Sequence, residues 1–380
     1  MQNILVNIST QNINYEIIFS DNIAKSLENN IKNIQKTKIF FVIDDYFYSL
    51  YENIILELEK KLKMSYILIK HWEKNKNYKT VFKIIDKLLE CKISRNDYIV
   101  SLWWWVTWDI TAFACSLFKR WVNLVQIPTT LLSMLDSSVW WKTWVDYNWI
   151  KNLIWTFYNP KLVIINKNFL KTLSKNEILS WMFEWIKHSI LNSRSDFLEF
   201  SCIYDKILLS ENEENLDWLI KKNIEYKLKI VSSDPYEQNW NRRVLNYWHT
   251  FWHAIETNSN FKLPHWICVW FWILFANILS YKNWFLDKNI MDEISEIILN
   301  LLKNINLKKL DFEKLYDLML NDKKNSNDKV KFILLKKYWE TVQFDATKDE
   351  IKEAFKLFIE VINNPYLEFF PFSQRERGHN

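Results

Sequence analysis

The chain has 380 residues, of which 49% are hydrophobic and 25% are charged, and its formal net charge is +5. This length predicts two domains, and the composition excludes a disordered or fibrous protein. Because the charge is mild and no Lys/Arg block is long, a nucleic-acid-binding platform is not expected.

The four cysteines are widely spaced and form no CxxC pair. A disulfide framework or a cysteine zinc cluster is therefore not expected, and a reducing cytoplasm fits. The N-terminal segment lacks a basic-then-apolar signal, and the longest uncharged stretch, 266–281, is too short to predict a membrane span. We expect a cytoplasmic protein with no membrane or nucleic-acid partner.

Short strands alternate with helices in the first part of the chain. The N-terminal residues alternate like a strand, and 38–45, 65–70 and 97–102 predict buried strands. Residues 46–62 and 80–93 have helical periodicity. This order predicts an α/β domain with a Rossmann-like parallel sheet covered on both faces, which we place at residues 1–165.

The pattern changes after about residue 170, and most of the remaining chain has helical periodicity. Residues 166–380 therefore form a predicted second, mainly α-helical domain, in which 329–335 is the one strong strand signal. The predicted helices are 174–192, 196–209, 213–231, 242–258, 266–282, 287–304, 311–320 and 348–363.

Glycine and tryptophan occur in abnormal numbers, with one Gly and 22 Trp. A chain of this length normally has about 27 glycines. The strand at 97–102 runs directly into WWWVTWDI, where the phosphate-binding glycines of a nucleotide-binding turn are expected. If each Trp is replaced by Gly, this segment becomes GGGVTGDI, a typical turn of that kind.

The same substitution produces recognisable motifs in five further segments. With Trp written as Gly, 71–76 is HGEKNK, 126–146 is QIPTTLLSMLDSSVGGKTGVD, 181–187 is GMFEGIK, 242–256 is RRVLNYGHTFGHAIE and 263–266 is LPHG. Together with GGGVTGD at 103–109, they keep one order and spacing from about residue 40 to 340. On these six motifs the chain resembles the 3-dehydroquinate synthase family of sugar-phosphate cyclases.

A codon reassignment explains the tryptophan excess most simply. UGA encodes Trp in some genetic codes and Gly in others. Translating the gene with the wrong code would therefore print Trp at every glycine that UGA encodes. We therefore expect most of the 22 Trp to be Gly in the organism's own protein. The alternative is a chain that is truly rich in Trp, in which indoles would fill the phosphate turn and leave it without catalytic activity.

Histidines on one helical pattern suggest a metal site. His249 and His253 are four residues apart and share a face, and three N or O ligands with an open position are typical of catalytic zinc. Such a pair alone is weak evidence, because structural histidines are at least as common. The resemblance implies Glu184, His249 and His265 as ligands of Zn²⁺ or Co²⁺, and His253 as a substrate contact. We expect His71 and His188 to be structural and His379 to belong to the tail.

The resemblance also implies a cationic substrate site. A single lysine is usually a solvated surface charge, but an anionic sugar phosphate requires several converging cations. Asp136 has a simpler alternative role as a helix cap. The implied contacts to the carboxylate, phosphate and hydroxyls of the substrate are Lys142, Lys151, Lys187, Lys227, Arg242, Lys323, Lys324, Asp136, Asn152 and Asn246.

An NAD site is implied at the first domain. Asp44 lies at the end of a buried strand, where an acid typically binds a ribose hydroxyl. The resemblance assigns Glu73 and Lys76 to the adenosine side. Thr172 and Glu177 have an alternative role in helix capping. The remaining expected contacts are Trp103, Trp104, Trp105 and Trp108 of the turn, Asp109, Thr129, Thr130, Lys142, Lys151, Phe169, Thr172 and Glu177.

The chain departs from the family pattern at one loop. The family has an acid four residues before the arginine that matches Arg242, whereas Glu237 lies five before it. Gln238, which lies four residues before Arg242, is therefore the alternative to Glu237 at the position of the family's acid.

The resemblance implies one reaction and leaves rivals. The implied enzyme converts 3-deoxy-D-arabino-heptulosonate 7-phosphate to 3-dehydroquinate and phosphate, by transient oxidation with NAD, phosphate elimination, re-reduction and aldol closure, as part of aromatic amino acid biosynthesis. A related sugar-phosphate cyclase and a metal-dependent polyol dehydrogenase are the alternatives. With Trp written as Gly, the motifs KTGVD at 142–146 and GIKN at 149–152 argue against the dehydrogenase. A homodimer is also implied.

Overall fold

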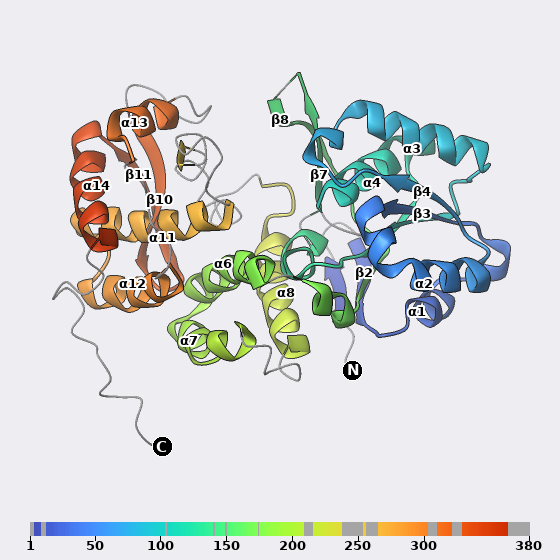
Figure 1. Ribbon diagram of the computed structural model, residues 1–380, viewed down its shortest axis with the longest axis horizontal. Helices are drawn as coiled ribbons and strands as arrows, with labels where there is room; N and C mark the ends of the chain where they lie inside the picture. The colour runs from blue at the N-terminus through green and yellow to red at the C-terminus, as the bar shows by residue number, and fades with distance from the viewer. Residues whose placement is uncertain are drawn as a thin grey trace, which may run out of the picture. The chain divides into compact units, whose positions relative to one another are not determined.

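The computed structural model describes residues 4–8, 13–102, 105–139, 141–148, 150–173, 175–208, 216–237, 254–255, 265–302, 310–320 and 329–363. Contacts divide the chain into two compact units, residues 1–175 with 210–232 and residues 176–209 with 233–380 (Figure 1). The sequence pattern predicts a single boundary between residues 165 and 166. By contacts, helix α8 (Leu216–Ser233) belongs almost entirely to the first unit.

A seven-stranded sheet forms the centre of the first unit, in the order β1-β2-β9-β6-β5-β3-β4. Six strands are parallel and β1 alone pairs antiparallel, with β2. The parallel sheet predicted from the sequence is confirmed, but the N-terminal segment forms two paired strands instead of one. The strands are β1 (Ile4–Ile8), β2 (Ile13–Phe19), β3 (Ile39–Asp44), β4 (Ser65–Ile69), β5 (Tyr98–Leu102), β6 (Asn123–Ile127) and β9 (Leu162–Ile165).

Helices cover both faces of this sheet (Figure 1). Side chains alternate along a strand, so Phe41 and Ile43 of β3 pack with α1 and α2, whereas Phe40 and Val42 pack with α3 and α4. Polar side chains start several helices, as when Asn77 accepts a hydrogen bond from the Thr80 N–H at the start of α3. The helices are α1 (Ile23–Asn30), α2 (Asp45–Leu62), α3 (Tyr78–Glu90), α4 (Trp105–Leu117) and α5 (Leu131–Leu135).

A separate hairpin in the first unit was not predicted. Strands β7 (Lys142–Tyr147) and β8 (Ile150–Phe157) pair antiparallel outside the main sheet. The buried Val145 packs with the cluster under α3 and α4, which fixes β7 to the core. The hairpin therefore carries Lys142, Lys151 and Asn152 to the side of the sheet that α3 and α4 cover.

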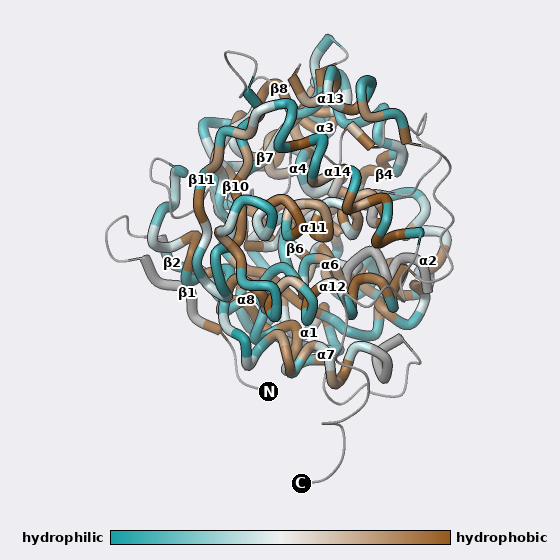
Figure 2. Tube along the Cα trace, turned by 90° about the vertical axis from the view of Figure 1, so that its left-hand side faces the viewer, coloured by the Kyte–Doolittle hydropathy of each residue, from teal (hydrophilic) through white to brown (hydrophobic). Residues whose placement is uncertain are grey.

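The second unit is mainly helical, as predicted. Its most apolar helix, α11, is buried along Ile267–Leu279 and is brown in Figure 2. The strand predicted at 329–335 is confirmed as β10 (Val330–Lys337), but its partner β11 (Glu340–Ala346) was not predicted. The helices are α6 (Lys175–Asn192), α7 (Arg194–Leu208), α11 (His265–Lys282), α12 (Lys288–Leu302), α13 (Phe312–Leu320) and α14 (Lys348–Asn363).

The helix predicted at 242–258 lies outside the described residues, except for 254–255. Among the helices that the structure describes, none is long and apolar enough to cross a membrane.

Candidate active site

The carboxyl ends of β3, β4 and β5 meet at one edge of the sheet, where ligands of such folds bind. Helix α4 begins at Trp105, three residues after β5 ends at Leu102. This is the strand–turn–helix context expected for a phosphate-binding turn. Trp103 and Trp104 lie outside the described residues, and the side chain of Trp105 is not described.

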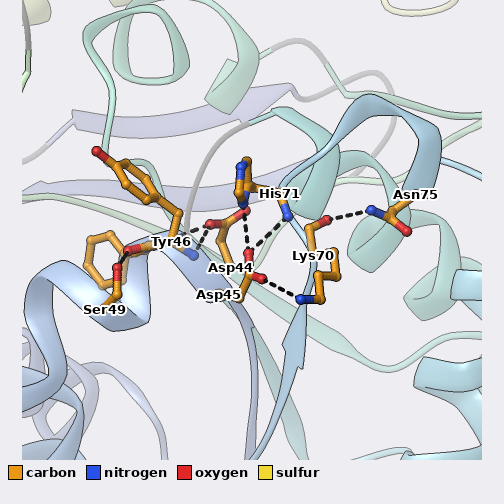
Figure 3. Close-up of polar contacts among 8 residues, drawn as sticks. Asp44, Asp45, Tyr46, Ser49, Lys70, His71 and Asn75 are labelled. Atoms are coloured by element: carbon orange, nitrogen blue, oxygen red, sulfur yellow. Dashed lines mark hydrogen bonds and ion pairs between the residues drawn. The ribbon is translucent and has the colours of Figure 1, made fainter.

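Asp44 ends β3 and caps helix α2 (Figure 3). Its Oδ1 accepts hydrogen bonds from the backbone N–H groups of Tyr46, at 2.8 Å, and Phe47, at 3.2 Å. Its Oδ2 is buried and has no hydrogen-bond partner. Burial raises the pKa of Asp44 to about 7, although the two hydrogen bonds oppose the shift. A buried acceptor without a donor fits a ligand hydroxyl, as predicted for the ribose.

Asp45 joins the start of α2 to the end of β4. Its Oδ1 accepts hydrogen bonds from the backbone N–H of His71, at 3.1 Å, and from His71 Nδ1, at 2.8 Å (Figure 3). Burial alone would raise the pKa of Asp45, but the hydrogen bonds from His71 and the nearby Lys70 lower it. Ligand atoms of Asp44, Asp45 and His71 lie within 4.8 Å of one another. Because Asp45 and His71 already bind each other, we do not assign a metal to this trio.

Lys76 links residues that were expected to bind different parts of the cofactor and substrate. It lies in the loop after β4 and contacts helix α4 and strand β8. Its Nζ lies 2.6 Å from Asp109 Oδ2 on α4 and donates to Asn152 Oδ1 on β8 at 2.7 Å. The Lys76 and Asp109 side chains are 5% and 7% exposed. Burial raises the pKa of Asp109, and the ammonium of Lys76 opposes the shift. The predicted adenosine, pyrophosphate and substrate contacts therefore form one network.

Two further contacts extend this network along the hairpin. Lys151 Nζ lies 3.8 Å from Glu73 Oε1, and the side chains are 68% and 36% exposed, so this is a weak surface pair. Asp146 Oδ1 accepts the backbone N–H of Asn152 at 2.8 Å. Asp146 was not among the predicted site residues, although it ends the KTGVD motif.

Several predicted cofactor contacts have structural roles in this unit. Thr130 caps α5 in a reciprocal box with Ser133. Phe169 packs edge-on against Tyr51 of α2, with ring centroids 5.1 Å apart, and the Thr172 hydroxyl lies 2.8 Å from the Tyr51 hydroxyl. Thr129 differs, because its buried hydroxyl has no hydrogen-bond partner in the structure.

A buried ion pair links two predicted substrate contacts of the first unit. Lys227 of α8 donates to the carboxylate and the backbone carbonyl of Asp136. The Lys227 side chain is fully buried. Asp136 is also the C-cap residue of α5, so its two expected roles are compatible. Lys142 of β7 is buried, with its Nζ 5.5 Å from the ring centroid of Trp144.

Helix α6 holds the predicted metal ligand that the structure describes. Glu184 is buried and forms an ion pair with Lys187, one turn along the helix. His188 is also buried, with Nε2 3.6 Å from Glu184 Oε2. The buried Glu184 carboxylate and the nearby His188 imidazole are both ligand types that zinc takes, although Lys187 now pairs with this carboxylate.

Trp108 is buried on α4, and the remaining predicted residues are described only in part or not at all. Glu237 has a positive φ of 54° at the end of its described segment. The side chains of Glu177 and His265 are not described. Outside the described residues lie Gln238, Arg242, Asn246, His249, His253, Lys323 and Lys324.

Two family models match the chain. One, described as 3-dehydroquinate synthase N-terminal, matches residues 66–180, and the other, described as 3-dehydroquinate synthase C-terminal, matches residues 182–325. A 3-dehydroquinate synthase of Staphylococcus epidermidis is 34% identical over 348 residues, which cover 90% of this chain and 95% of that protein. One from Ruminiclostridium cellulolyticum is 37% identical over 286 residues, or 75% and 79% of the two chains.

Solved structures share the fold at lower identity. A 2-deoxy-scyllo-inosose synthase complexed with carbaglucose-6-phosphate, NAD⁺ and Co²⁺ matches with a TM-score of 0.80 and 19% identity, covering 94% of this chain and all of that one. The 2-epi-5-epi-valiolone synthase ValA of Streptomyces hygroscopicus subsp. jinggangensis 5008, with NAD⁺ and Zn²⁺ bound, matches with a TM-score of 0.80 and 20% identity over 92% and 97% of the chains. Glycerol dehydrogenase from Schizosaccharomyces pombe has a TM-score of 0.58 at 11% identity, over 95% and 94% of the chains.

Proposed function

This chain belongs to the 3-dehydroquinate synthase family and is a phosphate-eliminating lyase that forms 3-dehydroquinate, and we propose that it does so with NAD and a divalent metal ion held by the site residues assigned below. The substrate is 3-deoxy-D-arabino-heptulosonate 7-phosphate. A bound nicotinamide would supply a reversible hydride acceptor, and a bound metal would acidify the substrate alcohol.

The free oxygen of Asp44 is the observation that best supports an NAD site. Its Oδ2 is buried without a partner at the carboxyl end of β3, and a ribose hydroxyl would supply the donor it lacks. Lys76 and Asp109 lie at the neighbouring turn and bring a cation to the start of α4. We assign Asp44 to a ribose hydroxyl, and Lys76 and Asp109 to the adenosine and pyrophosphate side.

Glu184 supports the metal assignment from the second unit. Its carboxylate is buried and paired with Lys187, and carboxylate oxygen is one of the ligand types that Zn²⁺ takes. We assign Glu184, His249 and His265 to a Zn²⁺ or Co²⁺ ion, and His253, Asn246 and Arg242 to the substrate. Asp136 and Lys227 are assigned to the substrate as a pair that fixes the orientation of the carboxylate.

Turnover of the purified full chain tests this function. We expect phosphate release and 3-dehydroquinate formation that depend on added NAD, with no net NADH. Accumulation of NADH with a polyol would indicate the dehydrogenase alternative, and turnover of glucose 6-phosphate instead of the heptulosonate would indicate a related cyclase.

His249→Ala tests the metal ligands. We expect this variant to lose both bound zinc and turnover, because a tetrahedral site cannot retain its affinity with a ligand removed. His379→Ala is a matched control from the C-terminal tail and is expected to retain both. Metal content by mass spectrometry and phosphate release measure the two effects, and a His249→Ala protein with full zinc content would refute the assignment.

We also propose a homodimer. Strand β8 exposes Ile150, Leu153 and Ile154, the first at 43%, and an apolar hairpin of this kind is usually covered by another chain. Light scattering of the purified protein measures the mass in solution, and a monomer at assay concentrations would contradict the proposal.

Backbone geometry supports the proposed conversion of Trp to Gly. Trp284 and Trp339 have φ values of 62° and 64°, in the left-handed region that glycine alone adopts freely. Both residues lie outside the motifs that carry the family resemblance. Trp270 adds a second observation, because its indole Nε1 is buried without a hydrogen-bond partner.

Mass spectrometry of the protein from its own organism tests this conversion. Peptides spanning Trp284 and Trp339 should have the mass of glycine at both positions, and the gene should carry UGA there. An intact mass that matches the printed sequence would refute the proposal.

A further inference from the structure

The hairpin of β7 and β8 contains a bulge. Between the residue pairs Val145–Ile154 and Tyr147–Ile150, one residue of β7 lies opposite three residues of β8. Bulges redirect the side chains of the longer strand and often occur beside active sites. The residues involved are Asp146 on β7, and Lys151, Asn152 and Leu153 on β8.

Asp146 joins the two sides of this bulge. Its Oδ1 accepts the backbone N–H of Asn152 at 2.8 Å. Asn152 has a φ of 52°, in the left-handed region that Asn tolerates better than most residues, which turns the chain at the bulge. The side chain of Asp146 provides that contact at the centre of the bulge.

The backbone of Asp146 connects the bulge to the segment between β4 and α3. Its N–H donates to the carbonyl oxygen of Lys76 at 2.7 Å, and it forms an isolated parallel bridge with Asn77. Asp146 therefore contacts the segment that carries Lys76 through its backbone and the bulge through its side chain.

The bulge directs two side chains toward the loop after β4. Asn152 Oδ1 accepts a hydrogen bond from Lys76 Nζ at 2.7 Å, and Lys151 Nζ lies 3.8 Å from Glu73 Oε1. A regular strand places successive side chains on opposite faces, so without the bulge Lys151 and Asn152 would not both be directed at this loop.

We propose that Asp146 is a positioning residue, whose carboxylate holds the β8 bulge and thereby presents Lys151 and Asn152 to Glu73 and Lys76 in the cofactor site. The proposal rests on the NAD site proposed above, to which Lys76 is assigned. Asp146 acts through the Asn152 backbone and does not itself contact the ligand.

The test compares three variants of the full chain. Asp146→Ala removes the acceptor, Asp146→Asn retains an amide oxygen that accepts the same hydrogen bond, and Thr156→Ala changes the regular part of the same hairpin, where Thr156 pairs with Thr143. NAD affinity is measured by calorimetric titration, and the backbone amide exchange of residues 150–157 is measured by mass spectrometry.

We expect Asp146→Ala to raise the NAD dissociation constant about tenfold or more, as for loss of a hydrogen bond to a charged group. Amide exchange at residues 151–153 should become faster in the same variant. Asp146→Asn should restore both values to within about threefold of wild type, because the acceptor is retained. Thr156→Ala should change neither.

Other results would overturn the proposal. Unchanged NAD affinity in Asp146→Ala would show that the bulge does not position the cofactor contacts, and equal losses in Asp146→Ala and Asp146→Asn would exclude the hydrogen-bond acceptor as the cause. If the wild-type chain binds no NAD, the proposed function fails. The exchange measurement then still decides whether Asp146 holds the bulge.

Discussion

Replacing Asp44 with Asn separates the stability of the fold from cofactor binding. Asn also caps helices well, so it keeps the bonds to the N–H groups of Tyr46 and Phe47 while removing the charge. In the protein without NAD, the change therefore tests the free energy of burying an ionised carboxylate whose Oδ2 has no partner.

The magnitude comes from the pKa of Asp44, which is raised from 3.8 to about 7 by burial. An acid with a raised folded-state pKa stabilises the fold fully below its unfolded-state pKa, and this stabilisation is lost as the pH rises through the folded-state value. Each pKa unit corresponds to about 1.4 kcal/mol, so the wild type should lose about 3 kcal/mol between about pH 5 and about pH 8 through this group.

Urea unfolding of the two proteins without NAD measures the effect. The free energy of unfolding of Asp44→Asn, relative to wild type, should rise by about 3 kcal/mol from about pH 5 to about pH 8. NAD affinity should fall about tenfold in the same variant, because a charge-assisted hydrogen bond is lost. A stability difference that does not change with pH would refute the burial of an unpaired carboxylate, and unchanged NAD affinity would refute the ribose contact.

Two further predictions concern other parts of the chain. Lys76→Met should lower the free energy of unfolding by about 3–5 kcal/mol, because it leaves the buried carboxylate of Asp109 without its cation, and a loss below about 1 kcal/mol in urea unfolding would contradict this. Trp284→Gly and Trp339→Gly should each raise the free energy of unfolding by about 1 kcal/mol, because glycine adopts their positive φ without strain. Trp121→Gly is the matched control, since Trp121 is also exposed but has an extended φ of −176°, and a gain of the same size there would remove backbone strain as the cause.

The sequence predicted the parallel sheet well because its strands are continuous apolar runs. β3, β4 and β5 begin and end within one residue of the segments predicted at 38–45, 65–70 and 97–102. Burial on both faces imposes this composition, so the signal is local. Asp44 was likewise predicted from its position alone, as the acid that ends a buried strand.

The paired hairpins were harder to predict. β8 is exposed along most of its length and carries Ile, Leu and Trp on both faces, so no polar–apolar alternation marks it as a strand. β11 pairs with β10, and it alternates the apolar Val342, Phe344 and Ala346 with the polar Gln343 and Asp345, a pattern typical of a strand that was not predicted. Only β8 therefore has no buried face that its sequence could show, because the apolar side of β11 is the less exposed one.

Contacts within the site could be predicted least. Glu73, Lys76, Asp109 and Asn152 come from separate elements, and the resemblance assigned them to different parts of the ligands. Their convergence depends on the register of β7 and β8, which the bulge at Asp146 shifts. Register depends on tertiary contacts such as the bond from Asp146 to Lys76, and no local pattern encodes it.

The left-handed turns at Trp284 and Trp339 have a consequence for reading the gene. A backbone torsion is set by the path of the surrounding chain, whereas the printed letter is set by a codon table. At these two exposed turns the path of the chain favours glycine, whereas the printed residue is Trp. Peptides that span Trp284 and Trp339 therefore test the proposed conversion independently of the family motifs, whereas the extended backbone at Trp121 favours no particular residue.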